Sequence, residues 1–277
     1  MIEIVEANVL ADQMNKVISG KRISGVTTLA SPHKFAFFHG DSESYEGLLK
    51  GKQIGEASPN GGQLKLKIED LIFVFGDGVD LRYIVADAKR PVKHQLLMEF
   101  EDGSALSGSV QMYGFLWLTR EEEFDNPYYL VAKEKPSPLT EQFDYPYFLN
   151  ILSVPGAEKL SAKAVLATEQ RIPGIGNGVL QDILYHAGLH PKRKVGTFTE
   201  ADKERLYQSI KNTLSEMIRC GGRDTEKDLY GNPGGYITSL SKNTVGKTCP
   251  KCSHTIRKEA YLGGSIYYCD GCQPMVK

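Results

Sequence analysis

The chain has 277 residues, of which 41% are hydrophobic and 24% charged. That length suggests about two domains plus a small appended module. Residues 1–6 lack the basic and apolar regions of a signal peptide, and no run of 18 apolar residues occurs. We therefore expect a cytoplasmic protein with no membrane association, in which close pairs of cysteines bind metal more often than they form disulfides.

The charges are distributed unevenly along the chain. Residues 1–150 hold 15 basic and 22 acidic side chains, a net charge of −7, whereas residues 151–277 hold 18 and 12, a net charge of +6. Bound zinc would lower the second value, because four thiolates carry more charge than the ion. A moderately basic carboxyl-terminal half is still compatible with binding to nucleic-acid phosphates.

The first 130 residues predict one helix followed by a β-rich domain. Residues 3–19 show helical spacing and stop at Gly20. Strand-like stretches follow at 22–29, 35–38, 63–68, 71–75, 95–100 and 106–118, separated by turns at 61–62, 76–78 and 102–103. Together these patterns indicate an α+β fold with an antiparallel β-sandwich or barrel.

Residues 131–146 are rich in proline and predict a linker. Helical periodicity dominates the next part, residues 147–240, with one helix ending at Gly188 and another beginning with a capping box at Thr199 and Asp202. A glycine-rich stretch at 231–236 then leads to a cysteine module at 243–277. We therefore expect a helical domain followed by a small metal-binding module.

Two Cys-x-x-Cys motifs define that module. Their cysteines are Cys249, Cys252, Cys269 and Cys272, with sixteen residues between the motifs. At this spacing four thiolates can surround one zinc ion tetrahedrally, and residues 255–260 and 265–268 can pair as a hairpin between them. So small a module has too little core to fold without its metal, which predicts one structural zinc.

A glycine-containing turn precedes the helix that ends at Gly188. Gly174-Ile175-Gly176-Asn177 lets the backbone approach an anion, and the free amides of a helix start attract phosphate. The same pattern also occurs in ordinary turns. Lys192 and Arg193 follow in a basic run, and together with the cysteine module they favour a DNA-binding interpretation.

These features resemble those of the formamidopyrimidine-DNA glycosylase and endonuclease VIII family of base-excision repair enzymes. The strongest match covers residues 166–194 and the four cysteines with Gln273. The resemblance implies an amino-terminal helix and β-sandwich, a helix-two-turn-helix domain and a zinc finger. It also implies a partner, double-stranded DNA with a damaged or abasic site, and a monomer. DNA contacts are expected at Ile175, Gly176, Asn177, Lys65, Lys192 and Arg193.

The opening Met1-Ile2-Glu3-Ile4-Val5-Glu6 resembles the family's amino-terminal motif with one departure. Family enzymes expose a proline amine that attacks sugar C1′ as a nucleophile, and here the position holds Ile2. A bulky second residue disfavours removal of methionine, so we expect the amine to remain on Met1. Glu3 and Glu6 match the family's acidic positions as candidate catalytic residues, and they are also typical of a first helical turn.

Further departures affect the residues that hold the DNA in the family. The family's arginine in the zinc hairpin corresponds to Gly264, and its lysine in the sandwich corresponds approximately to Gln63. Lys65 and Lys67 are possible substitutes for that lysine. Residues 111–113 correspond to those that fill the gap left in the duplex.

Three hypotheses follow. In the first, the chain binds damaged or abasic DNA and the proline-dependent lyase chemistry is lost or altered. In the second, it is an active glycosylase and lyase that uses Glu3 with a substitute nucleophile such as the Met1 amine or Lys65. In the third, the module is a zinc ribbon that binds another protein.

Overall fold

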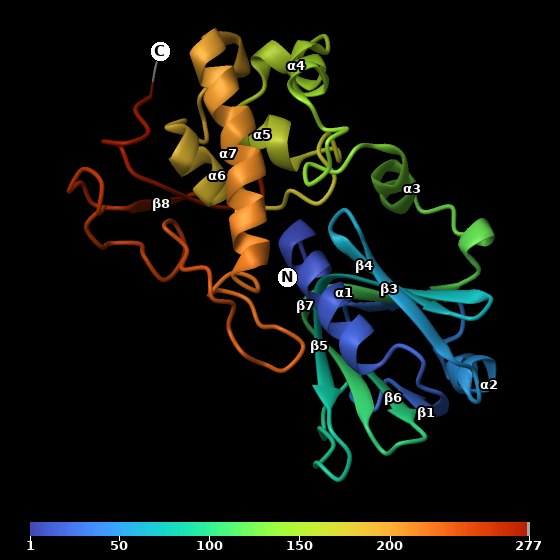
Figure 1. Cartoon of the computed structure of the whole chain (residues 1–277). Helices are drawn as coiled ribbons and strands as arrows, with labels where there is room; N and C mark the ends of the chain where they lie inside the picture. Colours follow the sequence, from blue (N-terminus) through green and yellow to red (C-terminus); the bar gives the residue numbers. More distant parts are fainter. Residues whose placement is uncertain (276–277) are drawn as a thin grey trace. The chain divides into compact units, whose positions relative to one another are not determined.

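The computed structural model describes residues 1–275 (Figure 1), which form two units. The first unit contains residues 1–130 together with the short segment 226–234. The second contains residues 131–225 and the chain from residue 235 onward. The range 147–240 that we expected for the helical domain is thus interrupted by a nine-residue excursion into the first unit.

The first unit is built on an antiparallel sheet with strand order β1-β6-β7-β5-β4-β3, to which β2 adds in parallel beside β7. A five-residue helix, α2 (Tyr45–Leu49), follows β2. The expected fold class is confirmed. The strands are β1 (Ile23–Thr28), β2 (Ala36–Phe38), β3 (Ile54–Asn60), β4 (Gln63–Ile68), β5 (Leu71–Ile84), β6 (Leu96–Phe100) and β7 (Ala105–Thr119).

Helix α1 (Ile4–Val17) packs on the sheet at β3 and β4. Its start is fixed by Glu6, whose carboxylate accepts a hydrogen bond from the Glu3 amide at 3.2 Å. Leu10 and Met14 lie one turn apart on the buried face. The predicted helix is therefore confirmed, and its amino-terminal end is held by the two candidate catalytic carboxylates.

The turn expected at residues 76–78 is wrong. Gly76, Asp77 and Gly78 lie inside β5, where the pairing with β7 shifts register at a bulge between Asp77 and Val79. Asp77 adopts φ of 56°, and a Cβ on Gly78 would meet the Tyr113 carbonyl at 2.6 Å. The two glycines thus allow β5 and β7 to lie close together at a bulge, and they do not form a hairpin turn.

Strand β3 was not predicted, because Gly55 and Pro59 weaken its β-pattern. It lies at the end of the strand order. An edge strand tolerates proline because one side of its backbone has no neighbour to bond. The sequence pattern of β3 is consequently a poor predictor of this edge strand.

The segment 226–234 is anchored to the first unit by a buried side chain. Leu229 is fully buried in the sheet's core, its carbonyl accepts from the Tyr83 amide at 2.9 Å, and its amide donates to the Gln13 side chain at 2.9 Å. Arg82 adds a hydrogen bond to the Asp228 carbonyl at 2.9 Å. The excursion is therefore a fixed part of the β-unit.

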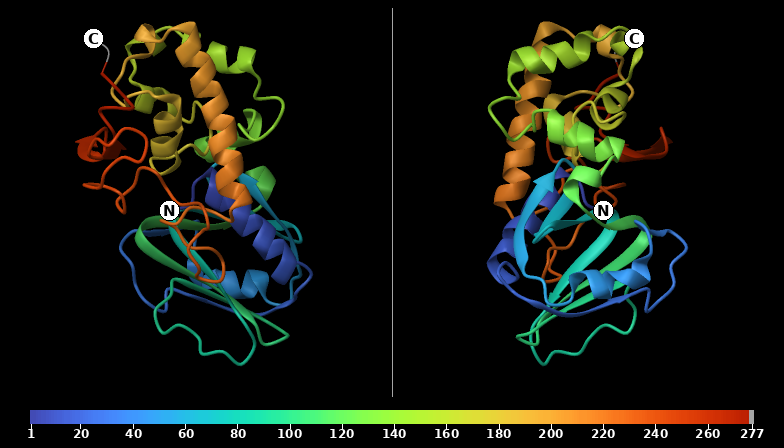
Figure 2. Two further views of the ribbon diagram at one scale, coloured as in Figure 1. Left: turned by 60° about the vertical axis from the view of Figure 1, so that its left-hand side comes forward. Right: turned by 90° about the vertical axis from the view of Figure 1, so that its right-hand side faces the viewer.

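The second unit is helical and ends in a hairpin. Its two main helices bury the apolar stripes that the sequence predicted, with Leu180, Ile183 and Leu184 on one and Leu206, Ile210 and Leu214 on the other. The β8–β9 hairpin projects from these helices (Figure 2). The elements are α3 (Pro127–Glu134), which spans the unit boundary, α4 (Tyr145–Ser153), α5 (Ala162–Ala167), α6 (Val179–Ala187), α7 (Glu200–Arg219), β8 (Arg257–Tyr261) and β9 (Gly264–Tyr268).

Within residues 1–275, no helix is both long enough and apolar enough to cross a bilayer.

The turn between β6 and β7 gives the first testable prediction. Hydrogen bonds from Lys21 at 2.6 Å and from Ser104 lower the pKa of Asp102 to about 2. A carboxyl group with a depressed folded-state pKa stabilises the fold above its unfolded pKa of about 3.9, and that contribution disappears as the pH falls toward 2. Because Asp102 is exposed, we expect Asp102→Asn to cost less than about 1 kcal/mol of unfolding free energy at neutral pH.

Urea denaturation at several pH values measures the unfolding free energy of the wild type and of Asp102→Asn, and the quantity of interest is the difference between the two. The difference should shrink between about pH 4 and pH 2. Glu101→Gln at the neighbouring exposed position is the control. A difference that stays constant over this range would show that the Lys21 contact does not operate in solution.

Candidate nucleic-acid interface and metal centre

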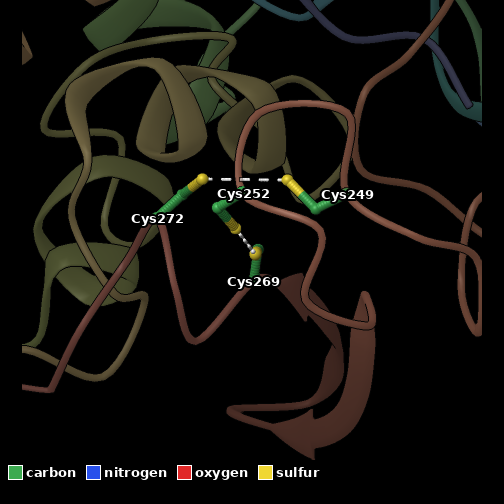
Figure 3. Close-up of side chains that lie close together, drawn as sticks. All are labelled: Cys249, Cys252, Cys269 and Cys272. Atoms are coloured by element: carbon green, nitrogen blue, oxygen red, sulfur yellow. Dashed lines mark hydrogen bonds between the residues drawn. The ribbon is translucent and has the colours of Figure 1, made fainter.

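Four cysteine sulfurs converge at the base of the β8–β9 hairpin (Figure 3). The Sγ atoms of Cys249, Cys252, Cys269 and Cys272 all lie within 4.8 Å of one another. Cys249 and Cys272 are separated by 3.7 Å, and Cys252 and Cys269 by 3.2 Å. A tetrahedron with Zn–S bonds of about 2.3 Å has sulfur–sulfur edges of about 3.8 Å. The cluster therefore fits one structural zinc ion, as the sequence predicted.

The electrostatics of the cluster also call for a cation. Burial acts to raise the pKa of Cys249, but hydrogen bonds from the Tyr185 hydroxyl and from two backbone amides bring it down to about 6. Burial and the neighbouring sulfurs raise the pKa of Cys272 to about 12. Four thiolates cannot share so small a space unless a divalent ion offsets their mutual repulsion.

The finger is docked on helix α6 through side chains from both sides. The Tyr185 hydroxyl lies 3.1 Å from the Cys249 sulfur. Gln181, one turn earlier on α6, accepts a hydrogen bond from the Tyr267 amide at 2.9 Å. Gln273 donates to the Leu189 carbonyl at 2.9 Å from the other end of the finger. Zinc binding and the position of α6 are thereby linked.

The candidate phosphate-binding turn directly precedes α6 and also contacts the hairpin. The Asn177 side-chain amide donates to the Ser265 carbonyl at 2.9 Å, while its Oδ1 is buried with no hydrogen-bond partner among the described residues. A Cβ on Gly264 would lie 3.3 Å from the Asn177 carboxamide. The turn and the hairpin therefore form one surface, with Asn177 at its centre.

The backbone amides of the turn differ in their availability. The Ile175 amide donates to the Ile172 carbonyl at 3.3 Å, a long bond within the turn. For the Gly176 amide, no acceptor is present in residues 1–275. Gly176 is consequently the amide best placed to meet an anion, and Gly174, with φ of 84°, supplies the left-handed conformation that the turn requires.

Arg223 is a neighbour of this turn that the sequence did not reveal. Its side chain is 2% exposed, and a Cβ on Gly178 would lie 1.7 Å from Nη1. The guanidinium therefore packs against the start of α6, where it adds positive charge to the helix amino terminus. Its only sequence signal is the preceding Gly221-Gly222, which indicates a helix end and not a contact some 45 residues away along the chain.

The basic candidates are held by acidic or aromatic partners. Lys192 pairs with Glu259 and lies over the Tyr261 ring at 5.4 Å. Lys65 lies 3.3 Å from a carboxylate of the first unit, that of Glu121. Either lysine must exchange this partner to bind a phosphate.

Arg193 has a different environment from the two lysines. Its guanidinium is buried, donates to Asp202 at 2.6 Å and to the Thr197 carbonyl at 2.8 Å, and lies over Phe198. Asp202 is also the capping residue of α7. Arg193 thus holds the start of α7, a structural task that the basic run did not suggest.

The amino terminus is bound to the β5 bulge. The Ile2 amide donates to the Asp77 carbonyl at 2.6 Å, and the Met1 amino group forms an ion pair with Glu226 of the excursion. Burial raises the pKa of the Asp77 carboxyl, although the positive amino terminus acts in the opposite direction. Glu3, the residue that precedes α1, is buried. An amine and several carboxyl groups are thus concentrated at one end of α1.

Comparisons with known proteins agree with this geometry. The family model described as the formamidopyrimidine-DNA glycosylase H2TH domain matches residues 135–228. The formamidopyrimidine-DNA glycosylase of a Wolbachia endosymbiont of Brugia malayi is 27% identical, over 99% of this chain and 100% of its own length. That of Bacillus cereus strain ATCC 14579 is 25% identical over the full length of both chains.

The chain is thus similar over its whole length to formamidopyrimidine-DNA glycosylases, and residues 135–228 match the H2TH domain of that family.

Solved structures of the glycosylase family have the same fold. A Lactococcus lactis protein, crystallised with DNA containing an abasic site, superposes with a TM-score of 0.82 at 23% identity, covering 98% of this chain and 99% of its own. The Thermus thermophilus protein superposes with a TM-score of 0.81 at 21% identity, covering 99% and 100%. The order of helix, sheet, helix-two-turn-helix domain and zinc finger is therefore that of the family.

Proposed function

We propose that this chain is a zinc-containing protein that binds double-stranded DNA at damaged or abasic sites, and in which the proline-dependent lyase chemistry of the family is lost or altered. The observation that carries the DNA-binding part is the surface formed by the Asn177 turn and the hairpin. Among the described residues it offers a phosphate the Gly176 amide, which has no other acceptor, the second N–H of the Asn177 Nδ2 group and a helix amino terminus. Relatives that match over their whole length bear the name formamidopyrimidine-DNA glycosylase.

The altered chemistry is supported by the amino terminus. Ile2 stands where the family resemblance places proline, and its amide is engaged with the Asp77 carbonyl. The Met1 amine faces the Glu226 carboxylate. A nucleophilic amine must be held against sugar C1′, and the ion pair instead holds the Met1 amine against a carboxylate of its own chain.

An active glycosylase that uses Glu3 and a substitute nucleophile is the second candidate. Glu3 and Glu6 are buried at the start of α1, close to the amino terminus along the chain, and a carboxyl group there could transfer a proton to a bound sugar. Lys65 is a weaker substitute because Glu121 holds its ammonium group. Incubation with an abasic-site duplex, measuring binding and strand cleavage together, separates the two candidates. The zinc ribbon that binds only protein would bind no duplex.

The DNA-binding proposal is tested by Asn177→Ala. A hydrogen bond to a charged phosphate contributes about 1.5–3 kcal/mol, so the affinity for an abasic-site duplex should fall by between about tenfold and a hundredfold. Affinity should also decrease steeply with salt, because each bound phosphate releases counterions. Fluorescence anisotropy of a labelled duplex at several salt concentrations measures both effects.

The control for this variant is Asn212→Ala, an exposed asparagine on α7 of the same unit. It should leave affinity unchanged. Because Asn177 also contacts Ser265, zinc content and thermal stability of Asn177→Ala must be compared with wild type. Unchanged affinity in a folded, zinc-loaded Asn177→Ala variant would contradict the docking of a phosphate at this turn.

A further inference from the structure

Two phenylalanine rings are exposed on the first unit beside β7. Phe35 is 45% exposed and Phe37 is 49% exposed. The intervening Ala36 and the following Phe38 point inward and pack against the core of the sheet. The alternation in β2 therefore places two aromatic faces in solvent, a costly arrangement for a domain that already has a large core.

The rings rest on a rigid support. Strand β2 pairs in parallel with β7, which places Phe37 beside Phe115. Phe115 stacks on Trp117 with ring centroids 4.2 Å apart, and Trp117 contacts Phe124 at 5.5 Å. This aromatic cluster lies on the face of the sheet opposite the main core. Phe37 thus continues a buried aromatic layer on a paired strand, and Phe35 precedes it in the turn that leads into β2, where the Gly114 amide bonds to its carbonyl.

Positive charge accompanies the rings. The Lys34 ammonium lies 5.0 Å from the Phe35 ring centroid, and the His33 ring meets the same phenylalanine edge-on at 6.4 Å. Residues 29–40 contain no acidic residue, although the first 150 residues carry a net charge of −7.

The two rings also lie next to residues 111–113, which the family resemblance assigns to the gap in the duplex. The Gly114 amide donates to the Phe35 carbonyl at 3.0 Å. Met112 and Tyr113, directly before Gly114, are 68% and 42% exposed. Apolar side chains of two neighbouring strands therefore form one surface that ends in the Phe35 and Phe37 rings.

We propose that Phe35 and Phe37, with Lys34 beside them, form a stacking platform for the DNA base that is left unpaired opposite the damaged position. This proposal rests on the proposed function. Aromatic rings accept any base through its π-face, and a neighbouring cation meets the adjacent phosphate. Lysine is depleted at protein–protein interfaces, whereas aromatic rings and a neighbouring cation together bind single-stranded nucleic acid.

The test compares two proteins on two DNA molecules. The proteins are wild type and the double variant Phe35→Ala/Phe37→Ala. One duplex has an abasic-site analogue opposite a normal base, and the other has the analogue on both strands, so that no unpaired base remains. We expect the variant to bind the first duplex between about fivefold and a hundredfold more weakly, because stacking of one base on an aromatic residue is that strong. On the second duplex the two proteins should bind equally.

Two further variants complete the design. Phe35→Leu/Phe37→Leu keeps the apolar area and should still lose affinity, because only the aromatic face stacks. Leu48→Ala, at a leucine of α2 that is 48% exposed, should lose none. Equal losses on both duplexes, or no loss on either, would overturn the platform. A variant that loses self-association in sedimentation while keeping its DNA affinity would instead assign the face to a second copy of the chain.

The outcomes also separate this proposal from the proposed function. If wild type binds neither duplex, DNA binding itself fails and the platform fails with it. If wild type binds but Asn177→Ala has no effect on either duplex, phosphate docking at the turn is contradicted and the phenylalanine variants still decide the platform. If Asn177→Ala weakens binding to both duplexes, and the phenylalanine variant changes the affinity for the two duplexes equally or not at all, only the platform is refuted.

Discussion

Cys269→Ser is expected to abolish zinc binding and unfold the carboxyl-terminal finger. Cys269 is fully buried and its sulfur lies 3.2 Å from that of Cys252, and a hydroxyl is a poor ligand in a site of soft thiolates. Structural zinc supplies on the order of 10 kcal/mol to the folding of comparable peptides, far more than hairpin pairing can replace. Elemental analysis should fall from one zinc per chain to none.

Loss of the finger should also weaken DNA binding, through contacts that the finger makes with α6. Ser265 on β9 holds the Asn177 carboxamide, and Tyr267 holds Gln181. Without these bonds the phosphate-binding turn loses its fixed geometry, so we expect the affinity for an abasic-site duplex to fall at least as far as in Asn177→Ala. Treatment of the wild type with a strong chelator should have the same effect.

Cys220→Ser is the matched control. Cys220 is the cap residue at the end of α7 and is not part of the four-sulfur cluster. Its thiol donates a hydrogen bond to the Glu216 carboxylate at 3.5 Å. It should retain one zinc and full DNA affinity. Freshly purified wild-type protein without zinc, or a Cys269→Ser variant that keeps its zinc, would show that the four thiolates do not form the site.

Local chemistry explains which parts of the fold could be predicted from the sequence. Cysteine spacing defined the metal centre, because four ligands in two short motifs leave few other geometries. Helices α1 and α7 were predicted from capping residues and apolar spacing. The bulge at Asp77 was mistaken for a turn, since glycines mark both features in a sequence.

Contacts between distant residues could not be predicted in this way. Arg223 reaches Gly178 only after α7 has returned along α6. Arg193 looked like a surface cation in a basic run, yet Asp202 on the next helix draws it into the interior. The docking of Leu229 into the sheet and the pairing of Met1 with Glu226 each span more than 140 residues of chain. No local pattern encodes these partners.

Borohydride reduction in the presence of abasic-site DNA is expected to trap little or no covalent adduct with this protein. A Schiff base requires an unprotonated amine held against C1′, and a misplacement of about 1 Å can cost about a hundredfold in rate. Here Ile2 lacks the proline ring, its amide is bonded to Asp77, and the Met1 amine pairs with Glu226. Gly264 offers no guanidinium to fix the neighbouring phosphate. The yield should therefore lie about a hundredfold or more below that of a proline-bearing relative assayed in parallel.

Two variants locate the cause of the missing adduct. Glu226→Gln removes the carboxylate that pairs with the Met1 amine, so it should raise the yield, and it should restore the yield in full only if this ion pair alone is responsible. Ile2→Pro should raise it further once intact-mass analysis confirms that the initiator methionine has been removed. Lys65→Ala tests the other candidate nucleophile and should change nothing, since Glu121 already holds that ammonium group. Efficient trapping by the wild type that disappears when the terminal amine is acetylated would establish Met1 as a working nucleophile. In that case the ion pair with Glu226 must break when DNA binds, and Glu3 would take the role of proton donor to the opening sugar.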